Sequence, residues 1–420
     1  MKKFNLLLIL SSFSFHINSQ TLLTPYEKDK TTTTTYQECI DYYFELAKRY
    51  DMVKIIEYGE TDIGKPLHLV VISKDEIFEP AEIRKSGKII LLVNNGIHAG
   101  EPDGIDASMM LVRDIVTGRV KNPVSGLKYD NVLDNVVLII IPIYSIGGVM
   151  NRNNFTRANQ VGPKEYGFRG NSQNRDLNRD FIKCDSKNAV AFIKIFQEWL
   201  PELFVDTHTT DGADYPYKMT YIAPLHDKSE PLASYMKNDL LSFLENDMKK
   251  KNFEMCPYVY LLKSTPDTGI VEFPETPRYS TGYSSLFNSI GFVSESHMLK
   301  THQERVEATY EFLVSLLMIA NSDFKKIKAN KIEADENTSK KNEFALRWQL
   351  DSAYYAKYSF SGYEAKYKKS SVTGFDKLYY DRSLSYEKEI NFYNRYLPAV
   401  TITKPIAYIV PQGWWQVVER

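Results

Sequence analysis

Residues 94–101 of the chain, NNGIHAGE, follow directly on the apolar run of residues 89–93. Such a short apolar run predicts a buried strand. His98 and Glu101 lie three residues apart just beyond it, and Gly100 lets the backbone turn and approach closely between them. Both side chains can then reach one ion, and zinc prefers such nitrogen and oxygen ligands. The stretch therefore predicts a metal site at the end of a strand.

His208 offers a third ligand at the end of another predicted strand, because the strand-forming run of residues 203–206 leads into it. Open α/β sheets build their sites at such strand ends. A lone HxxE pair also arises by chance, from a loop histidine and a helix-capping glutamate, and a lone strand-end histidine is more often structural. Two histidines and one glutamate together predict one Zn²⁺ per chain, with a fourth position open for water.

Strand-like and helix-like patterns alternate through the first three quarters of the chain. Helical spacing marks residues 37–50, 103–116 and 188–200, and strand patterns mark 53–58, 67–73, 88–93, 136–143, 203–206 and 291–294. The alternation predicts an α/β fold, with a mixed, mostly parallel β-sheet and helices on both of its faces. Thr301 and Glu304 form a capping box that opens a long helix, which we expect to fade near residue 329.

The composition changes after residue 330. A charge-rich stretch over residues 325–342 marks a boundary, and beyond it tyrosines recur in a partly alternating pattern that favours short antiparallel strands. We therefore expect a main domain over residues 20–330 and a small β-rich unit over residues 343–420. The unit is either a structural accessory or a sugar- or peptide-binding module. Its ending resembles the start of a new element, which leaves open that the chain is a fragment.

Residues 1–19 have the order of a secretory signal peptide: two lysines, a short apolar run, and small residues before Gln20. We expect an exported protein, secreted or periplasmic. No later run approaches the roughly 18 apolar residues that a membrane span needs, so we expect no stable membrane insertion after signal removal. The net charge of −1 provides no field to recruit nucleic acid. Three cysteines at unrelated spacings predict neither a disulfide framework nor a sulfur metal site.

Further motifs lie between and beyond the proposed ligands. Arg157 comes first, DLNR follows at residues 176–179, and Glu295 ends the last strand pattern. The order HxxE, Arg, DLNR, strand-end His and strand-end Glu resembles the M14 family of zinc carboxypeptidases. The resemblance covers roughly residues 36–320 and implies the fold, the metal and the activity of that family.

The resemblance also implies a role for each motif. It makes His98, Glu101 and His208 the zinc ligands, Glu295 the catalytic carboxylate, Arg157 the cation that polarises the scissile carbonyl, Asn178 and Arg179 the partners of the substrate's terminal carboxylate, and Asp176 the residue that orients His98. The residue types suit the chemistry. A carboxylate can take a proton from water, a cation can stabilise an oxyanion, and a guanidinium can hold a carboxylate by two hydrogen bonds. The competing interpretations are a strand-edge charge for Glu295 and a solvated charge run around DLNR.

The tyrosine that these enzymes place over the substrate has two candidates, Tyr279 and Tyr283, and the sequence slightly favours Tyr283. Arg278 adds a cation there, for which a loop salt bridge is a better interpretation than carboxylate binding. No charged residue lies between Tyr283 and Glu295. The sequence therefore indicates no preference for basic or acidic side chains.

The sequence as a whole predicts an exported zinc metallocarboxypeptidase that hydrolyses C-terminal bonds of peptides or proteins. A zinc amidohydrolase or deacylase acting on a small or cell-wall-derived substrate is one alternative, because it would share the zinc chemistry and differ in the carboxylate pocket. A non-catalytic peptide-binding relative is another. Glu295 and Arg157 argue against the binder, since binding alone requires neither a base nor an oxyanion cation.

Overall fold

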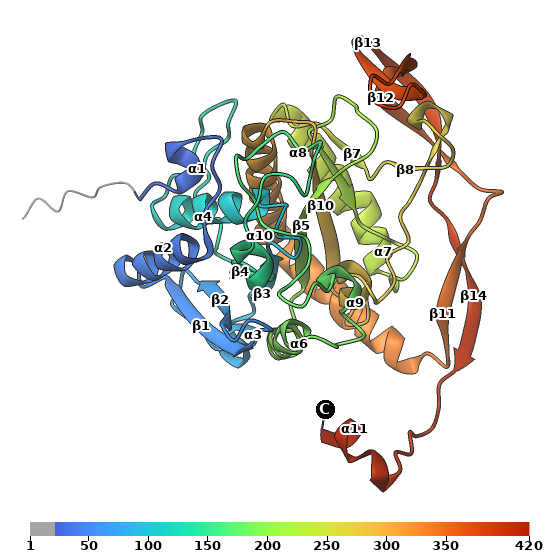
Figure 1. The fold of residues 1–420 in the computed structure, drawn as a ribbon. Helices are drawn as coiled ribbons and strands as arrows, with labels where there is room; N and C mark the ends of the chain where they lie inside the picture. Colours follow the sequence, from blue (N-terminus) through green and yellow to red (C-terminus); the bar gives the residue numbers. More distant parts are fainter. Residues whose placement is uncertain (1–21, 420) are drawn as a thin grey trace, which may run out of the picture.

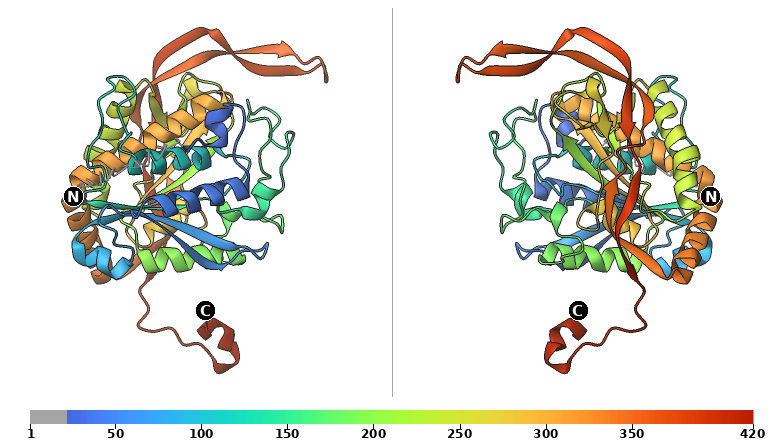
Figure 2. Two further views of the ribbon diagram at one scale, coloured as in Figure 1. Left: turned by 90° about the vertical axis from the view of Figure 1, so that its left-hand side faces the viewer. Right: turned by 90° about the vertical axis from the view of Figure 1, so that its right-hand side faces the viewer.

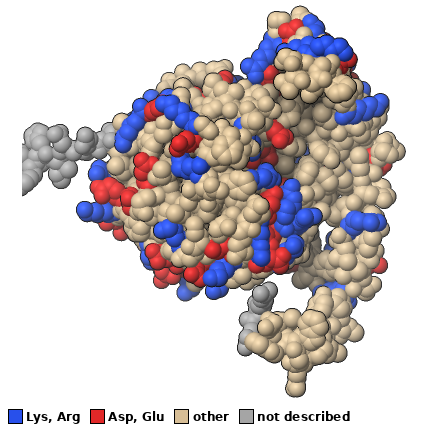
Figure 3. All heavy atoms as spheres, viewed as in Figure 1, with Lys and Arg blue, Asp and Glu red and all other residues tan. Residues whose placement is uncertain are grey.

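The computed structural model describes residues 22–419, so the expected signal peptide at residues 1–19 lies outside the described part of the chain. Figure 1 shows a main α/β body with a β-rich C-terminal unit along one side. Within the described residues, no helix is long and apolar enough to cross a bilayer. Acidic and basic side chains are interspersed on the face seen in Figure 3, as the net charge of −1 would suggest.

The main body is built on an eight-stranded sheet. In spatial order its strands are β1 (Val53–Glu60), β2 (Pro66–Ile72), β4 (Val136–Ile141), β3 (Ile89–Asn94), β5 (Leu203–Thr210), β10 (Ile290–His297), β6 (Met219–Ile222) and β7 (Met255–Pro257). The four central strands β4, β3, β5 and β10 run parallel to one another. Their carboxyl ends therefore meet at one edge of the sheet, which is where α/β proteins place their sites.

Helices cover both faces of this sheet (Figure 1). The helices α2 (Tyr36–Arg49), α4 (Asp103–Val116), α8 (Leu241–Lys250) and α10 (His302–Lys340) share one apolar core with it, and α3 (Pro80–Ser86), α6 (Lys187–Trp199) and α9 (Ser280–Ser285) share the other. Strand β3 supplies both cores, with Leu91 and Val93 on one side and Ile90 and Leu92 on the other, because side chains alternate along a strand. The predicted fold class, a mixed sheet with helices on both faces, is confirmed.

The C-terminal unit is joined to the main body by strand pairing. Strands β12 (Ala356–Lys369) and β13 (Asp376–Tyr393) form a hairpin that continues into β9 (Ile270–Val271) and β8 (Tyr260–Leu261) of the main body, while β11 (Glu343–Leu350) pairs with β14 (Tyr396–Thr403). Figure 2 shows the hairpin projecting from one side of the body and the C-terminal helix α11 (Trp415–Glu419) on the opposite side. The remaining short elements are α1 (Pro25–Lys28), α5 (Ile146–Met150), η1 (Leu177–Arg179), α7 (Leu232–Tyr235), η2 (Met236–Leu240), η3 (Pro266–Thr268) and η4 (Gln412–Trp414).

Helix α10 crosses the boundary that the charge pattern marks at residues 325–342, and it ends at Lys340 rather than near residue 329. Its second half still packs against the body, because Ile327 and Ala334 are fully buried. Lys331 Nζ also donates a hydrogen bond to the carbonyl of Phe287 at 2.8 Å. These few tertiary contacts cannot be recognised in a charge-rich sequence. The predicted helix end near residue 329 was therefore too early.

Gly104, in α4, lies directly against β5. A Cβ at this position would overlap the side chains of Thr207 and Asn95, which are hydrogen-bonded to each other at 2.8 Å. We expect Gly104→Ala to lower the melting temperature by a few degrees, because overpacking typically costs about 1–3 kcal/mol and the added Ala returns at most about 1 kcal/mol of helix propensity. The control is Gly59→Ala, whose Cβ would sit 3.6 Å from that of Ala191 in ordinary contact. Equal melting temperatures for the two variants would contradict this packing argument.

Candidate active site

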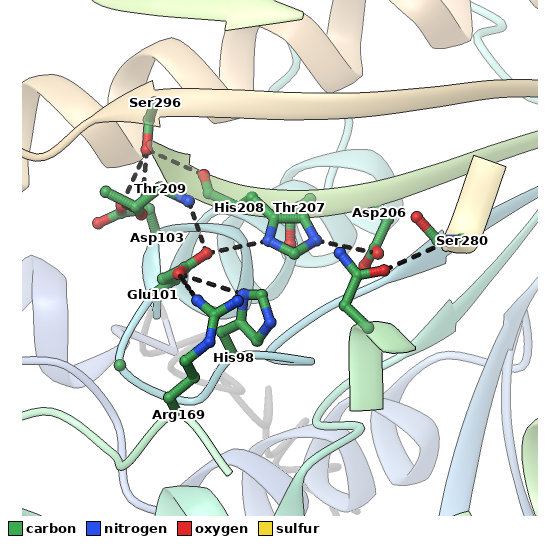
Figure 4. Close-up of polar contacts among 12 residues, drawn as sticks. His98, Glu101, Asp103, Arg169, Asp206, Thr207, His208, Thr209, Ser280 and Ser296 are labelled. Atoms are coloured by element: carbon green, nitrogen blue, oxygen red, sulfur yellow. Dashed lines mark hydrogen bonds and ion pairs between the residues drawn. The ribbon is translucent and has the colours of Figure 1, made fainter. Parts of the chain in front are cut away.

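The three proposed ligands come together at the carboxyl ends of β3 and β5. His98 and Glu101 lie in the turn between β3 and α4, and His208 lies on β5. Nδ1 of His98 is 3.2 Å from Oε1 of Glu101, and Nδ1 of His208 is 3.0 Å from its Oε2. All three side chains are buried, and one ligand atom from each lies within 4.8 Å of the others. Figure 4 shows the three side chains converging on one point.

The outer nitrogen of each histidine contacts a carboxylate. Nε2 of His98 lies 2.9 Å from Oδ1 of Asp176, and Nε2 of His208 lies 3.0 Å from Oδ2 of Asp206. A carboxylate fixes the proton on the nitrogen that it contacts, so Nδ1 of each ring keeps its lone pair for the shared point. Nδ1 of His98 is buried and makes no hydrogen bond within the described chain. This donor set, with its orphaned nitrogen, fits a Zn²⁺ ion.

Each carboxylate oxygen of Glu101 also accepts a hydrogen bond from a further donor. The backbone N–H of Thr209 donates to Oε2 at 2.9 Å, and Nη1 of Arg157 donates to Oε1 at 2.7 Å. Burial alone would raise the pKa of Glu101, but Arg157 and the two histidines lower it well below its usual range. The carboxylate is therefore held ionised, as a metal ligand must be.

A buried polar network supports Thr209 from below. Asp103 Oδ2 accepts hydrogen bonds from the hydroxyls of Thr209 and Ser296 and from Nε of Arg305. Its Oδ1 lies 2.8 Å from Nδ1 of His302. In the sequence pattern, Asp103 only marks the start of a predicted helix. Arg305 and His302 are distant from Asp103 in the chain, so no local sequence pattern indicates that Asp103 is the centre of this network.

Glu295 stands beside the ligands on the neighbouring strand. In the parallel pairing of β5 with β10, Glu295 is directly opposite His208, so the two side chains project to the same side of the sheet. The side chain is partly buried. Burial and the nearby Glu101 raise the pKa of Glu295 to about 8, although His208 and Arg157 act in the opposite direction.

These groups face a cavity of about 210 Å³. Its lining includes His98, Glu101, Arg157, Arg169, Asn178, Arg179, His208, Tyr279 and Glu295. Asn178 and Arg179 reach it from η1, where Oδ1 of Asn178 accepts a 3.3 Å hydrogen bond from the N–H of Ser280. The guanidinium of Arg179 lies 4.5 Å from the centre of the Tyr279 ring. Cations, carboxylates and the candidate metal ligands thus share one cavity.

Of the two candidate tyrosines, Tyr279 lines this cavity and Tyr283 does not. Tyr283 is 5% exposed and belongs to the second apolar core, with its ring centre 5.5 Å from that of Phe196 and 5.3 Å from that of Phe287. Tyr279 is the N-cap residue of α9, so the helix does not direct its side chain into the core. The structure thus places Tyr279 in the cavity and Tyr283, which the sequence slightly favoured, in the apolar core.

Arg169 and Glu275 are two of the cavity residues that the sequence motifs did not indicate. Arg169 is half-exposed, with Nε and Nη2 at 3.2 and 3.0 Å from Asp176 Oδ2 and Nη1 at 3.7 Å from Glu101 Oε1. Glu275 is buried and accepts hydrogen bonds from the N–H and hydroxyl of Thr281, and burial raises its pKa to about 7. Arg169 lies only seven residues before Asp176 in the sequence, and this proximity could have marked it as a candidate site residue. Glu275 lies before Tyr283 and so outside the segment between Tyr283 and Glu295 that was expected to shape the side-chain pocket.

Comparison with known protein families gives a match over part of the chain. The family model described as zinc carboxypeptidase matches residues 39–241. The chain therefore carries a domain of the M14 zinc carboxypeptidase family, and the resemblance drawn from the motifs is confirmed. No curated protein sequence gave a significant match.

Several solved structures align over much of the chain. A metallo-carboxypeptidase from Burkholderia cenocepacia is 13% identical, with a TM-score of 0.49 over 69% of this chain and 70% of its own. A carboxypeptidase A from Helicoverpa armigera is 14% identical, with a TM-score of 0.49 over 73% and 75%. A metallo-carboxypeptidase from Pseudomonas aeruginosa, solved with (2-guanidinoethylmercapto)succinic acid, is 12% identical, with a TM-score of 0.49 over 68% and 69%.

Zinc content tests the ligand set. We expect the purified parent to hold about one zinc per chain and His208→Ala to hold almost none, because loss of one ligand also loosens the other two. Asp206→Asn should keep the site but weaken zinc binding about 10- to 100-fold, since it changes only the contact that orients His208. His68→Ala, which alters a buried histidine on β2, is the control. A full zinc equivalent in the His208→Ala protein would refute the ligand set.

Proposed function

We propose that this protein is an exported zinc metallocarboxypeptidase that removes residues from the C-termini of peptides or proteins. The main support is one arrangement: a buried His, Glu and His set opens into the same cavity as Glu295 and Arg179. Zinc, when bound there, supplies a Lewis acid and lowers the pKa of a bound water to about 7. The export part of the proposal rests on residues 1–19, whose sequence has the order of a signal peptide.

Glu295 is proposed as the general base. It lines the cavity beside His208 and Glu101, where it can take the proton of the attacking water. Burial raises its pKa to about 8, close to neutral pH, and a group with such a pKa can accept a proton and later return it. The same carboxyl then protonates the leaving amine, so one residue serves both halves of the hydrolysis.

The oxyanion cation has two candidates, and we propose Arg169 in addition to the residue that the motif order suggested. Arg157 already directs Nε to Gln160, Nη1 to Glu101 and Nη2 to the carbonyl of Thr209, at 2.6 to 2.8 Å. Arg169 directs Nε and Nη2 to Asp176, and its side chain is 46% exposed. Its Nη1 can therefore turn to a substrate oxygen at lower cost, while Arg157 keeps Glu101 in position.

Asn178 and Arg179 are the proposed partners of the substrate's terminal carboxylate. The Arg179 guanidinium contacts the face of the Tyr279 ring, and its Nη1 donates to the backbone carbonyl of Asn178 at 2.6 Å. This leaves further N–H donors of the planar fork for a carboxylate. Because the terminal carboxylate of a peptide is the group that such a fork recognises best, the proposal is an exopeptidase rather than an endopeptidase.

Glu295→Gln separates catalysis from metal binding. We expect the variant to keep its zinc and its fold but to lose about 10²- to 10⁴-fold in kcat, because an amide cannot accept the proton of water. KM should change little. Turnover is measured on a free-acid peptide that the parent cleaves, with zinc content determined on the same samples. Near-parental turnover would remove Glu295 from the mechanism.

The recognition of a terminal carboxylate is tested with a peptide and its C-terminal amide. We expect the parent to prefer the free acid by about 30- to 1000-fold in kcat/KM, since the amide cannot form a charged pair with Arg179. Arg179→Ala should remove most of this preference, and Arg179→Lys should restore only part of it, because an ammonium lacks the planar fork.

Arg175→Ala is the matched control, because Arg175 donates to the carbonyl of Asp185 and does not line the cavity. It should keep the parental preference for the free acid. Equal rates of the parent on the acid and the amide would rule out the exopeptidase proposal and favour an amidohydrolase with the same zinc site.

A further inference from the structure

A second cavity adjoins the proposed active site. It measures about 170 Å³ and shares Ile222, Tyr258 and Phe273 with the active-site cavity. One part of its wall comes from β6 and α8 of the main body, and another comes from Tyr358 and Phe392 of the C-terminal hairpin. The two cavities are therefore neighbours that share part of their walls, and residues from both parts of the protein enclose the second one.

The wall of this second cavity combines aromatic rings with carboxyl groups. Its aromatic residues are Tyr221, Tyr258, Phe273, Tyr358 and Phe392. Its two acidic residues are Glu245, on α8, and Glu272, just after β9. Aromatic faces and carboxylates both attract cations, and the rings also accommodate an alkyl chain.

Glu272 is held in place by the C-terminal unit. Its N–H donates to the carbonyl of Tyr393 at 2.9 Å, and its own carbonyl accepts a hydrogen bond from the hydroxyl of Tyr396 at 2.6 Å. Oε2 of its side chain is buried and has no hydrogen-bond partner within the described chain. The nearest basic group is Nδ1 of His226 at 4.0 Å, and that nitrogen also lacks a hydrogen bond.

No lysine or arginine of the described chain forms an ion pair with either carboxyl. Oε1 of Glu245 accepts a hydrogen bond from the hydroxyl of Tyr221 at 2.7 Å. Lys228 lies near Glu272 but contacts Ser285 and Asp227 instead. Lys237 is exposed at the rim of the cavity, where solvent screens it. Burial and the nearby Asp227 raise the pKa of Glu272 to about 8, although Lys228 acts in the opposite direction. Burial also raises the pKa of Glu245.

We propose that this cavity is a subsite for a substrate side chain that carries a protonated amine on an aliphatic stem, as lysine and other diamino acids do. Glu245 and Glu272 are the counter-charges, and Tyr358 and Phe392 flank the stem. An apolar side chain would leave Oε2 of Glu272 without a donor, and unpaired buried polar atoms are costly. An ammonium group brings three donors to this place. The proposal rests on the peptidase function proposed above and specifies which substrates it favours.

Steady-state kinetics test the subsite with free-acid peptides in which lysine replaces norleucine at one position at a time. Norleucine has the same stem without the charge. At the position that faces the subsite, we expect the parent to favour lysine by about 10- to 100-fold in kcat/KM, the range for one charged hydrogen bond. The lysine to norleucine ratio should fall towards one in Glu272→Gln and should also fall in Glu245→Gln.

Glu254→Gln is the control, because Glu254 is exposed and pairs with Lys249 on the surface. It should leave both the ratio and the rates unchanged. A ratio near one at every position of the parent would overturn the subsite. An equal preference for lysine in the parent and in Glu272→Gln would do the same.

Direct binding separates the subsite from the peptidase activity. Titration calorimetry on the zinc-loaded full chain should detect 1-pentylamine but not 1-pentanol, and Glu272→Gln should lose the amine signal. Amine binding in a protein that cleaves no peptide would support the subsite and count against the proposed function. Peptide cleavage without a lysine preference and without amine binding would overturn the subsite and leave the proposed function intact.

Discussion

The buried carboxylate of Glu101 is the group on which the arrangement of the site depends. It lies within about hydrogen-bond distance of Nδ1 of both His98 and His208, so it brings two strand ends to one point. A buried carboxylate is tolerated only when it is surrounded by donors or cations. Arg157 and the N–H of Thr209 donate hydrogen bonds to Glu101. The buried carboxylate of Asp103, which accepts from the hydroxyl of Thr209, is in turn contacted by basic side chains of α10. The geometry of the site therefore depends on how α4, β5 and α10 pack together.

The C-terminal unit has a more direct relation to the site than its late place in the chain suggests. Strand β13 pairs with β9, and the hydroxyl of Tyr396 holds the backbone of Glu272. The segment from β8 to α9, which carries Phe273, Glu275 and Tyr279 into the active-site cavity, is thus attached to the hairpin. This attachment gives the tyrosine-rich sequence a role in forming the walls of the cavities. The sequence left open whether this unit is a structural accessory or a recognition module. A unit that supports the cavity walls can be both.

Where the sequence-based predictions fell short, the missing information was tertiary. The sequence favoured Tyr283 over Tyr279 only slightly, and the packing of Tyr283 against Phe196 and Phe287 places it in the core. Two arginines precede the DLNR motif, and only their hydrogen bonds and exposure distinguish Arg157, which donates to Glu101, from the half-exposed Arg169. The end of α10 was misjudged because two buried residues among many charges suffice to keep a helix on its sheet.

The sequence by itself determined the alternation of strands and helices, the fold class and the family, because apolar periodicity and closely spaced motifs are local properties of the chain. It also indicated His98, Glu101 and His208 as candidate ligands, since the first two lie shortly after one predicted strand and His208 ends another, and strand ends meet where the strands are parallel. Only the tertiary structure decided which tyrosine faces the cavity, that Asp206 orients His208, and that Glu245, Glu272 and the C-terminal hairpin enclose a second cavity. Those relations join residues far apart in the chain, and their geometry follows from packing rather than from any local pattern.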